Sequence, residues 1–419
     1  MTTMVLSSAA LAQPLTAFLE ASTTGNFDAR QSAAEAQRAQ ASFGQAWGAL
    51  LPALSANGGW THNQYDAVVP LPQPDGTTRN ITIVAKNQLD ATLKAEVPLI
   101  DAARWAQVAA GGASAEAAAR RTASTRLQVQ RQVVAAYYAW AAGLEVLASA
   151  QRSVDAARAQ VALRDARADA GVGNELELAR ARAEVERNLQ LLAAAEASLS
   201  NNARQLETLT GLAPSEPGTP VREAVSLPEL AELERGLTTL PSVEAATLEA
   251  RAAERTDLAS SLALVPAINA QFTQRFTNAS GFQNAPAQAS GGVTFNWRLD
   301  LVGVNAWRVQ RANGELARIA ADRARRAAED QLHSDFFNLR AAVKKVSSAR
   351  SQVAAARRAA DLARERSAAG VATQFDLIQA ERDLFAAEVS EVEADAEAAT
   401  ARAQLTLSAG NPLAAEVAR

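Results

Sequence analysis

The chain has 419 residues, of which 48% are hydrophobic but only 5% aromatic, and its formal net charge is −4. Because alanine supplies much of the apolar fraction, the composition favours long, closely packed helices over a bulky globular core. A slightly acidic chain without polybasic clusters is not expected to bind nucleic acid. The lack of cysteine excludes disulfides, thiol catalysis, iron–sulfur clusters and cysteine-bound zinc, and the two histidines, His62 and His333, lie in unrelated contexts. We therefore expect no metal site and no cofactor.

The first residues read like the end of a secretory signal. An apolar stretch leads to Ala10-Leu11-Ala12 before Gln13, which fits the small-residue cleavage pattern, although the first basic residue is Arg30. We predict that residues 1–12 are the remnant of a signal peptide, the alternative being a disordered N-terminus. Since no run of 18 apolar residues occurs, no transmembrane helix is expected.

Proline positions predict where the long helices lie. Residues 99–213 and 287–411 contain no proline, so nothing in these two tracts forces a helix to break. We predict helices over about 102–169 and 305–368, each roughly 100 Å long at 1.5 Å per residue. A shorter helix before each strand pair is expected to start near Asp28 and Ser242, both of which are good N-cap types.

The second half of the chain repeats the first. The aromatic pair at 137–138 corresponds to the pair at 336–337, with the same offset of 199 residues (370 minus 171) that separates Gly171 from Gly370. Each repeat is expected to run helix, strand, strand, long helix, tip and helix. The predicted layout is a signal remnant (1–12), a first repeat (13–212), a linker with part of an equatorial belt (213–241), a second repeat (242–411) and a C-terminal tail (412–419).

Two segments, 88–97 and 293–301, alternate strictly between apolar and polar residues. Such alternation predicts strands with one apolar and one polar face, and weaker partners precede them near 54–61 and 268–273. The sheet can pack on the helices as an ordinary amphipathic sheet, or its ten-residue strands can cross a bilayer at barrel tilt. Charges on the polar sides favour the second interpretation. The intervening segments, 64–87 and 278–291, are expected to be surface loops.

On the membrane interpretation, each strand residue is assigned to one side of a barrel. The residues expected to face the lumen are Asp90, Thr92, Lys94, Glu96, Thr294, Asn296, Arg298 and Asp300. The residues expected to face lipid are Trp60, Leu89, Leu93, Phe295 and Trp297. Four strands cannot close a barrel, and open edges in lipid leave backbone groups unsatisfied, so the chain must oligomerise. A trimer gives twelve strands, but the sequence does not distinguish three copies from two or four.

Duplicated halves, paired strands, long helices and glycine-centred tips together resemble the TolC-type outer membrane efflux protein family. The stretches that carry the resemblance are "LLPALSANGGW" before a strand, the paired tips and "AGVATQFDLIQAERDL". The resemblance implies a mixed, mainly α fold, in which α-helical hairpins form a periplasmic tunnel and four strands per chain join a trimeric twelve-stranded barrel. It also implies a homotrimer in the outer membrane lipid that docks a periplasmic adaptor (membrane fusion) protein and an inner-membrane pump of RND or ABC type.

The tips are first of all tight turns. Gly171 and Gly370 follow long helices and suit a left-handed C′ position, while Asn174 with Glu177 and Thr373 with Asp376 have capping-box spacing. In the family the tips contact the adaptor. By resemblance, that role falls on Gly171, Val172, Gly173, Asn174, Gly370, Val371, Ala372 and Thr373.

The family also closes its tunnel with acidic rings just beyond the second tip. Aligned from Gly370, one gate position falls on Asp376 and the other on Gln379, which is neutral here. Three copies of Asp376 would give a cation-favouring constriction, whereas Gln379 supplies no second acidic ring. Capping alone is the competing role for Asp376.

The predicted function is therefore a passive exit duct in the cell outer membrane, with its helical part in the periplasm, serving an efflux or type I secretion system. No dinucleotide fingerprint, Walker A or nucleophile-elbow pattern occurs, so we expect no catalysis. The alternative is a non-channel periplasmic coiled-coil adaptor or scaffold. The transported substrate and the class of pump are left open.

Overall fold

A computed structural model describes residues 13–171, 174–215, 229–282, 285–369, 371–411 and 413. The predicted signal remnant (1–12) and most of the predicted tail (412–419) lie outside the described residues, as do the tip residues Val172, Gly173 and Gly370. Of the predicted linker, 216–228 lies outside them.

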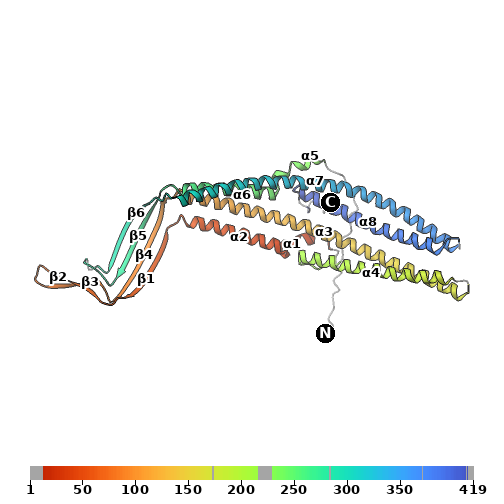
Figure 1. The fold of residues 1–419 in the computed structure, drawn as a ribbon, viewed down its shortest axis with the longest axis horizontal. Helices are drawn as coiled ribbons and strands as arrows, with labels where there is room; N and C mark the ends of the chain where they lie inside the picture. Colours follow the sequence, from red (N-terminus) through yellow and green to blue (C-terminus); the bar gives the residue numbers. More distant parts are fainter. Residues whose placement is uncertain are drawn as a thin grey trace, which may run out of the picture. The chain divides into compact units, whose positions relative to one another are not determined.

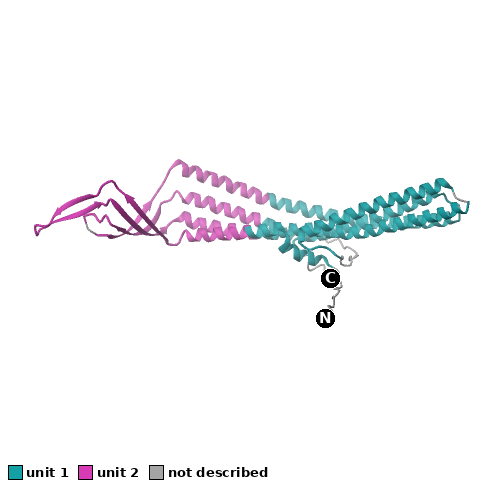
Figure 2. Cartoon of the chain, turned by 90° about the horizontal axis from the view of Figure 1, so that it is seen from below, with its two compact units in different colours: residues 1–34, 120–244, 323–419 teal, residues 35–119, 245–322 magenta. Residues whose placement is uncertain are grey.

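The chain forms two compact units (Figure 2). Unit 1 comprises residues 1–34, 120–244 and 323–419, and unit 2 comprises 35–119 and 245–322. Each unit therefore combines segments from both halves of the sequence, because the two longest helices contribute to both. The units hold different parts of the fold: the helical tips belong to unit 1 and the strands to unit 2.

Two helical hairpins contain the longest helices (Figure 1). Hairpin one joins α3 (Ala102–Asp169) to α4 (Glu175–Thr210), and hairpin two joins α7 (Leu301–Ala368) to α8 (Gln374–Ser408). The predicted bounds of α3 are confirmed, whereas α7 starts four residues before the predicted 305. The reason is a cap that the sequence reading assigned to a strand: Asp300 Oδ1 accepts from the Gly303 amide at 2.7 Å.

The start of α2 (Phe27–Gly48) also differs from the predicted cap at Asp28. Asn26 caps this helix, since its Oδ1 accepts from the amides of Asp28 at 2.9 Å and Ala29 at 3.2 Å. The short helix α1 (Leu15–Gly25), which the sequence reading did not separate, precedes this cap. The Asn26 side chain thus satisfies the first orphan amides of α2 at the junction of two helices.

The predicted cap of the corresponding helix in the second half, Ser242, is likewise wrong. Helix α6 spans Pro241–Leu262, so Ser242 already lies inside it. Proline at the first helical position is pre-organised for the helix and lacks the amide that would be orphaned there. Before it, the described part of the predicted linker forms α5 (Leu230–Glu234) and a 3-10 turn at Leu237–Thr239.

The main sheet is antiparallel and has the strand order β1-β4-β5-β6. Its strands are β1 (Ala53–His62), β4 (Asn87–Ile100), β5 (Ala267–Thr277) and β6 (Ala287–Asn296). Strands β4 and β5 are central, so β1 and β6 are the two edges of this sheet. The segment predicted as a surface loop, 64–87, instead contains a two-stranded hairpin, β2 (Ala67–Pro72) with β3 (Thr78–Val84).

The strand predicted over 293–301 is wrong at both ends. Strand β6 begins at Ala287, within the predicted loop, and ends at Asn296. Trp297, Arg298 and Asp300 therefore lie in the connection to α7 rather than on a strand. The alternation of apolar and polar residues continues past the end of the strand for another reason. Asp300 is polar because it caps α7, and Arg298 is polar because it pairs with Asp300 at 2.7 Å. The expectation that Arg298 and Asp300 are strand residues facing a lumen fails on this point.

Unit 1 is held together by two clusters of buried apolar side chains. In the first, Phe18 of α1 is fully buried, and its ring lies 5.7 Å from Tyr137 and 6.2 Å from Trp140 of α3. In the second, Leu332 and Leu339 of α7 pack with Leu405 of α8 and with residues of the 3-10 turn. Next to these clusters, Arg131 of α3 pairs with the buried Asp335 of α7 at 2.8 Å and donates to Gln404 O of α8. Burial and this ion pair together fix α3 against hairpin two.

One described helix, α3, contains an 18-residue window whose mean hydropathy, 1.4, is high enough to cross a membrane by composition. No unbroken run of 18 apolar residues occurs in the chain, so the sequence alone predicts no such helix. Of that window 44% is buried. Val133 and Val134 of the same helix are fully buried against α1 and α4 partners in the first cluster, so packing within the chain accounts for part of the apolar character of α3.

Candidate functional site

The strand register sorts the main sheet into two chemically distinct faces. Directly opposed residues in an antiparallel pair share a face. Trp60 opposes Leu89, Leu93 opposes Ala56 and Ile268 opposes Phe295. One face is consequently apolar across all four strands except for one glutamine. Its members are Leu54, Ala56, Gly58, Trp60, Leu89, Ala91, Leu93, Ala95, Val97, Ile268, Ala270, Phe272, Gln274, Phe276, Ala287, Ala289, Gly291, Val293 and Phe295.

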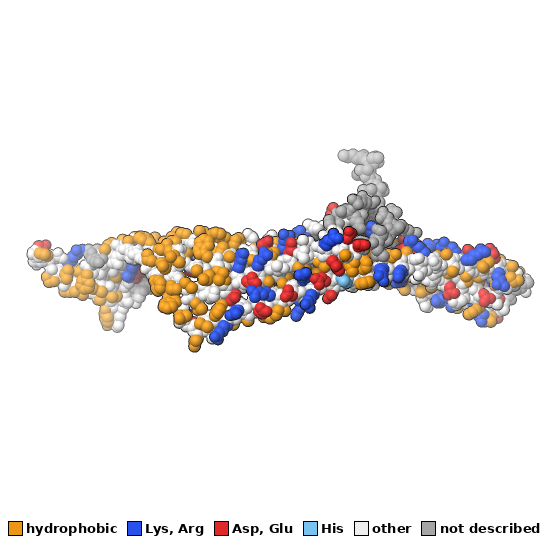
Figure 3. All heavy atoms as spheres, turned by 90° about the horizontal axis from the view of Figure 1, so that it is seen from above, with side chains coloured by type: hydrophobic (Ala, Val, Ile, Leu, Met, Phe, Trp, Pro, Cys, Tyr) orange, Lys and Arg blue, Asp and Glu red, His pale blue; other side chains and the backbone are white. Residues whose placement is uncertain are grey.

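The apolar face is exposed rather than covered by helices. Trp60 and Phe295 are each 65% exposed, and Leu89 and Leu93 are more than half exposed. Figure 3 shows hydrophobic side chains gathered over the strands and the neighbouring helix ends of unit 2. The ordinary amphipathic sheet packed on a core is therefore excluded for this chain. Trp297 is exposed as well, but it follows β6, and its Nε1 donates to Leu264 O at 3.1 Å.

The opposite face carries the predicted polar residues. Asp90, Thr92, Lys94, Glu96, Thr294 and Asn296 all lie on it, together with residues of β5 that the sequence reading missed. Arg275 of β5 donates to Asp90 Oδ1 at 2.7 Å, and Lys94 pairs with Glu96 at 2.8 Å. The alternation of β5 was visible only as far as residue 273, although it extends to Thr277 in the structure.

At the first tip, the backbone turns at Gly171. Its φ of +76° is the left-handed conformation predicted for it, and its amide donates to Ala168 O at 2.9 Å. Asn174 caps α4, but its side chain accepts from Leu176 rather than from Glu177. The capping box predicted for Asn174 and Glu177 is therefore wrong. Glu177 instead accepts from Arg164 at 3.1 Å.

At the second tip, the predicted capping box is confirmed. The Thr373 side chain accepts from the Asp376 amide at 3.2 Å, and Asp376 Oδ2 accepts from the Thr373 amide at 3.1 Å and hydroxyl at 2.7 Å. Val371 donates to Arg366 O at 2.9 Å, which closes the end of α7. The two predicted gate residues are both exposed, and Gln379 donates to Asp383 at 2.9 Å.

Arg164 connects all four helices beside the tips. Its guanidinium, in α3, donates to Glu177 of α4, to Ser367 of α7 at 3.3 Å and to Gln374 of α8. The residue is only 7% exposed and Gln374 is 2% exposed. At the corresponding position of the second half stands Ala363. This difference explains why Glu177 pairs with an arginine, whereas Asp376 accepts hydrogen bonds from the N-cap residue Thr373 of its own helix. The periodicity of α3 gave no signal for Arg164, because one buried arginine in an arginine-rich helix is not distinguishable by sequence.

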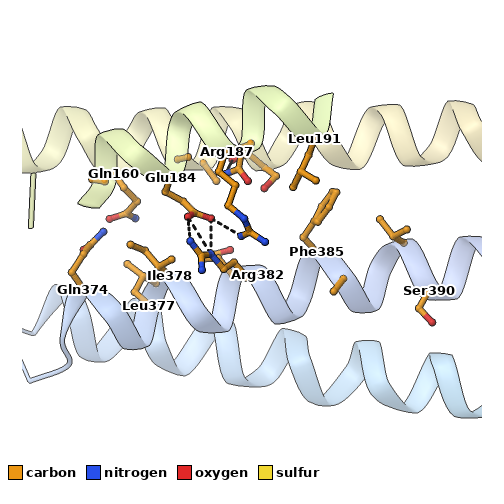
Figure 4. A pocket seen from close by; sticks show the side chains of 18 of the residues that line it. Gln160, Glu184, Arg187, Leu191, Gln374, Leu377, Ile378, Arg382, Phe385 and Ser390 are labelled. Carbon is orange, nitrogen blue, oxygen red and sulfur yellow. Dashed lines mark hydrogen bonds and ion pairs between the residues drawn. The ribbon is translucent and has the colours of Figure 1, made fainter. Parts of the chain in front are cut away.

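A second ion pair, Glu184–Arg382, links the two hairpins further from the turns than Arg164 does. Arg382 Nε of α8 donates to Glu184 of α4 at 3.0 Å, and Arg187 Nη1 donates to the same carboxylate at 3.3 Å (Figure 4). The hydrogen bond to Glu184 raises the pKa of Arg382 above its ordinary value. Within the described ranges, no group of three His, Asp or Glu side chains is placed to hold a metal ion.

The capping box makes the second tip sensitive to acid. Hydrogen bonds from the Thr373 hydroxyl and amide lower the pKa of Asp376. A carboxyl whose pKa is depressed on folding contributes stability above its unfolded pKa, ~3.9, and that contribution is lost as the pH falls through the folded value. Amide exchange of residues 373–377 is therefore expected to be slower in the wild type than in Asp376→Ala at pH 7. The difference is expected to shrink as the pH is lowered below ~3.9. A difference that does not change with pH would contradict a charged cap.

Comparison with known proteins supports one family. The family described as outer membrane efflux protein matches residues 19–212 and 234–411. Among curated protein sequences, none matches the chain. The solved outer-membrane channel OprN is 21% identical, with 95% of this chain and 90% of that one covered and a TM-score of 0.78. VceC of Vibrio cholerae is 17% identical, with 95% and 96% covered and a TM-score of 0.78.

MtrE of Neisseria gonorrhoeae, solved as an open outer membrane channel, is 18% identical, with 95% of this chain and 89% of that one covered and a TM-score of 0.76. At such identities the likeness shows the fold, while the family match covers most of the chain. The predicted resemblance is thereby confirmed, and the adaptor or scaffold alternative is set aside. The chain belongs to the outer membrane efflux protein family: it is an efflux channel protein of the outer membrane, with its helical part in the periplasm.

Proposed function

We propose that three copies of this chain form a passive exit duct, which carries substrates from a periplasmic adaptor and an inner-membrane pump to the exterior. The observation that carries the proposal is the main sheet: one face is apolar and exposed, and both edges, β1 and β6, lack a strand partner within the described chain. Channel families are not enzyme families, and the proposed duct performs no chemical step.

The open edges require neighbouring copies. In lipid, an unpaired edge leaves a row of backbone amides and carbonyls without partners, each at a cost of several kcal/mol. Pairing β1 of one copy with β6 of the next is a head-to-tail contact that closes into a ring. Three copies give twelve strands, an even number in the range of bacterial barrels.

In this barrel the apolar face contacts lipid and the polar face lines the lumen. The charges on the polar face are mixed: Asp90 and Glu96 are offset by Arg275 and Lys94, and each is paired with a neighbour. A lumen of balanced, paired charge favours neither anions nor cations. The barrel is therefore proposed as an unselective exit, suitable for small molecules or for polypeptides of a type I secretion system.

The hairpin tips are proposed as the adaptor-contact surface. Leu176, Val371 and Phe375 at or just after the turns are 57%, 67% and 59% exposed. Large apolar side chains at an exposed turn cost solvation free energy unless a partner covers them. Gly171, Asn174, Ala372 and Thr373 complete the described part of this surface, and the proposal extends to Val172, Gly173 and Gly370, which lie outside the described residues.

Asp376 is proposed as the selective element at the closed end. In a trimer, three exposed carboxylates would face one another across the axis and attract cations. An Asp carboxyl is charged at neutral pH, and hydrogen bonds from Thr373 lower the pKa of Asp376 further. The cap and the gate do not exclude one another, since Thr373 occupies only Oδ2 of the carboxylate. Gln379 adds no charge to the ring.

Disulfide trapping tests the trimeric barrel. The chain has no cysteine, so introduced pairs are unambiguous. Ala56→Cys on edge β1 combined in turn with Ala287→Cys, Ala289→Cys, Gly291→Cys or Val293→Cys on edge β6 is expected to give a covalent trimer in outer membranes for at least one register. The control pair Ala56→Cys with Leu93→Cys, which are opposed within one chain, is expected to give only cross-linked monomers. Monomers for every β1–β6 pair would contradict the ring.

Tip docking is tested at Val371. Val371→Asp is expected to reduce efflux at least tenfold while trimers still assemble, because the substitution places a charge where an apolar contact is proposed. The control is Arg358→Ala, a change at an exposed position of α7 that precedes the tip. Efflux by Val371→Asp equal to that of the control would exclude the tip as the adaptor contact.

The gate is tested with Asp376→Asn, which removes the charge but keeps an oxygen that can accept from Thr373. The ratio of cation to anion permeability in planar bilayers is expected to fall several-fold. Asp361→Asn on α7 removes an acid outside the proposed ring and is expected to leave the ratio unchanged. An unaltered permeability ratio for Asp376→Asn would exclude a gate role, and capping of α8 would be the remaining role of Asp376.

A further inference from the structure

An open groove of about 560 Å³ runs between α3 and α6 in unit 2, beside the strand ends that these helices adjoin. Its lining is apolar except for Asp101, and its large side chains are Leu99, Ile100, Trp105, Leu258 and Leu262. Trp105 and Leu258 are 57% and 52% exposed. Large apolar side chains gathered in an open groove indicate that another molecule covers them.

The one charged group in the lining is held by its own helix. Asp101 Oδ1 accepts from the Arg104 amide at 3.0 Å, and Asp101 Oδ2 pairs with the Arg104 guanidinium at 2.9 Å. The Asp101 side chain is only 14% exposed. Its charge is neutralised by this ion pair, so the surface that the groove offers to another molecule is apolar.

The groove continues the apolar face of the main sheet. Ile100, in its lining, opposes Ile268, which lies on that face opposite Phe295. Trp105 packs edge-on against Trp47 of α2, with ring centroids 6.0 Å apart. Tryptophans at the end of an apolar band are typical of the boundary between bilayer and water.

A neighbouring copy is not expected to cover this groove. Helices α3 and α6 adjoin the central strands β4 and β5, whereas the proposed contacts between copies involve the edge strands β1 and β6. For an outer membrane protein, the molecule that meets an apolar surface at the middle of the sheet is therefore lipid.

A basic side chain marks the end of the groove that is farther from the strands. Leu262, Leu258 and Arg255 follow one another at intervals of four and three residues, so they share one face of α6. Because α6 leads into β5, Arg255 is the member farthest from the sheet. Its Nη1 donates to Ala109 O of α3 at 2.9 Å, which holds the guanidinium across both helices. The exposed Arg255 forms no ion pair with the described residues.

We propose that this groove binds one glycerophospholipid from the leaflet that faces the helices. An acyl chain lies along Trp105, Leu258 and Leu262, and the phosphate accepts from the N–H groups of Arg255 that do not bond to Ala109. Arginine has five N–H donors in a planar fork that suits phosphate oxygens. Basic pockets beside membrane-spanning segments bind lipid head groups in this way. The inference rests on the lipid-facing side of the proposed barrel, but not on the number of copies.

The probe is palmitoyl-oleoyl phosphatidylglycerol, added in mixed micelles to the full chain in detergent and counted by native mass spectrometry. Saturable binding of one lipid per chain is expected. Arg255→Gln is expected to weaken phospholipid binding about fivefold, because it removes one contact between a charge and the phosphate. The diacylglycerol with the same chains lacks the phosphate, so the same variant is expected to leave its weaker binding unchanged. Arg308→Gln, at an exposed position of α7 outside the groove, is expected to bind the phospholipid like the wild type.

A second variant tests the apolar walls. Leu258→Asn is expected to weaken binding of the phospholipid and of the diacylglycerol alike, while the helical circular dichroism is retained because the side chain is half exposed. Leu316→Asn changes an exposed leucine of α7 outside the groove and is expected to leave both unchanged.

Three results would overturn the proposal. The first is an equal loss of binding in Arg255→Gln and Arg308→Gln, or in Leu258→Asn and Leu316→Asn, which would show attraction to the whole surface instead of a site. The second is competition by glycerol phosphate, which has no acyl chains. The third is a wild type without saturable binding, including the case in which a second copy covers the groove. None of these results alters the β1–β6 cross-links, so the lipid site and the trimeric duct are tested separately.

Discussion

The structure depends on one constraint, the backbone hydrogen bonding of a four-stranded sheet that does not close. Its register places the apolar residues of all four strands on one exposed face and the charged residues on the other. Water can solvate the polar face, but an exposed apolar face of this extent calls for lipid. In lipid the edges β1 and β6 must in turn be paired. Membrane insertion and assembly thus follow from the same register, and the long helices connect this sheet element to the tips in sequence.

Near the tips, the duplication has diverged in a way that separates two tasks. In hairpin one, Glu177 pairs with Arg164 and takes no part in a capping box. Arg164 also donates to Ser367 and Gln374 of hairpin two. In hairpin two, position 363 is alanine, so Asp376 keeps its capping box and remains exposed. Removing the charge partner of a buried arginine is strongly destabilising, and Arg164 is only 7% exposed. One tip therefore anchors the hairpins to each other, while the other leaves a carboxylate available.

Much of the fold could be predicted because its signals are periodic and long. Proline-free tracts located α3 within its observed bounds, and alternation located β4 and both faces of the sheet. The failures lie where a local side-chain bond competes with the pattern. Asp300 continued the alternation of β6 but caps α7, and Asn26 replaced Asp28 as a cap. The hydrogen bonds of Arg164 join segments far apart in sequence, and no single-sequence pattern contains such contacts.

In the proposed barrel, one face of β4 meets lipid and the other meets water. Single nitroxide labels at successive positions 88–96, introduced through cysteine into the cysteine-free chain and measured in outer membrane vesicles, test it directly. A period of two is expected, with labels at 89, 91, 93 and 95 more accessible to oxygen and labels at 88, 90, 92, 94 and 96 more accessible to a water-soluble nickel chelate. Accessibility without alternation, or with the two sets reversed, would contradict it.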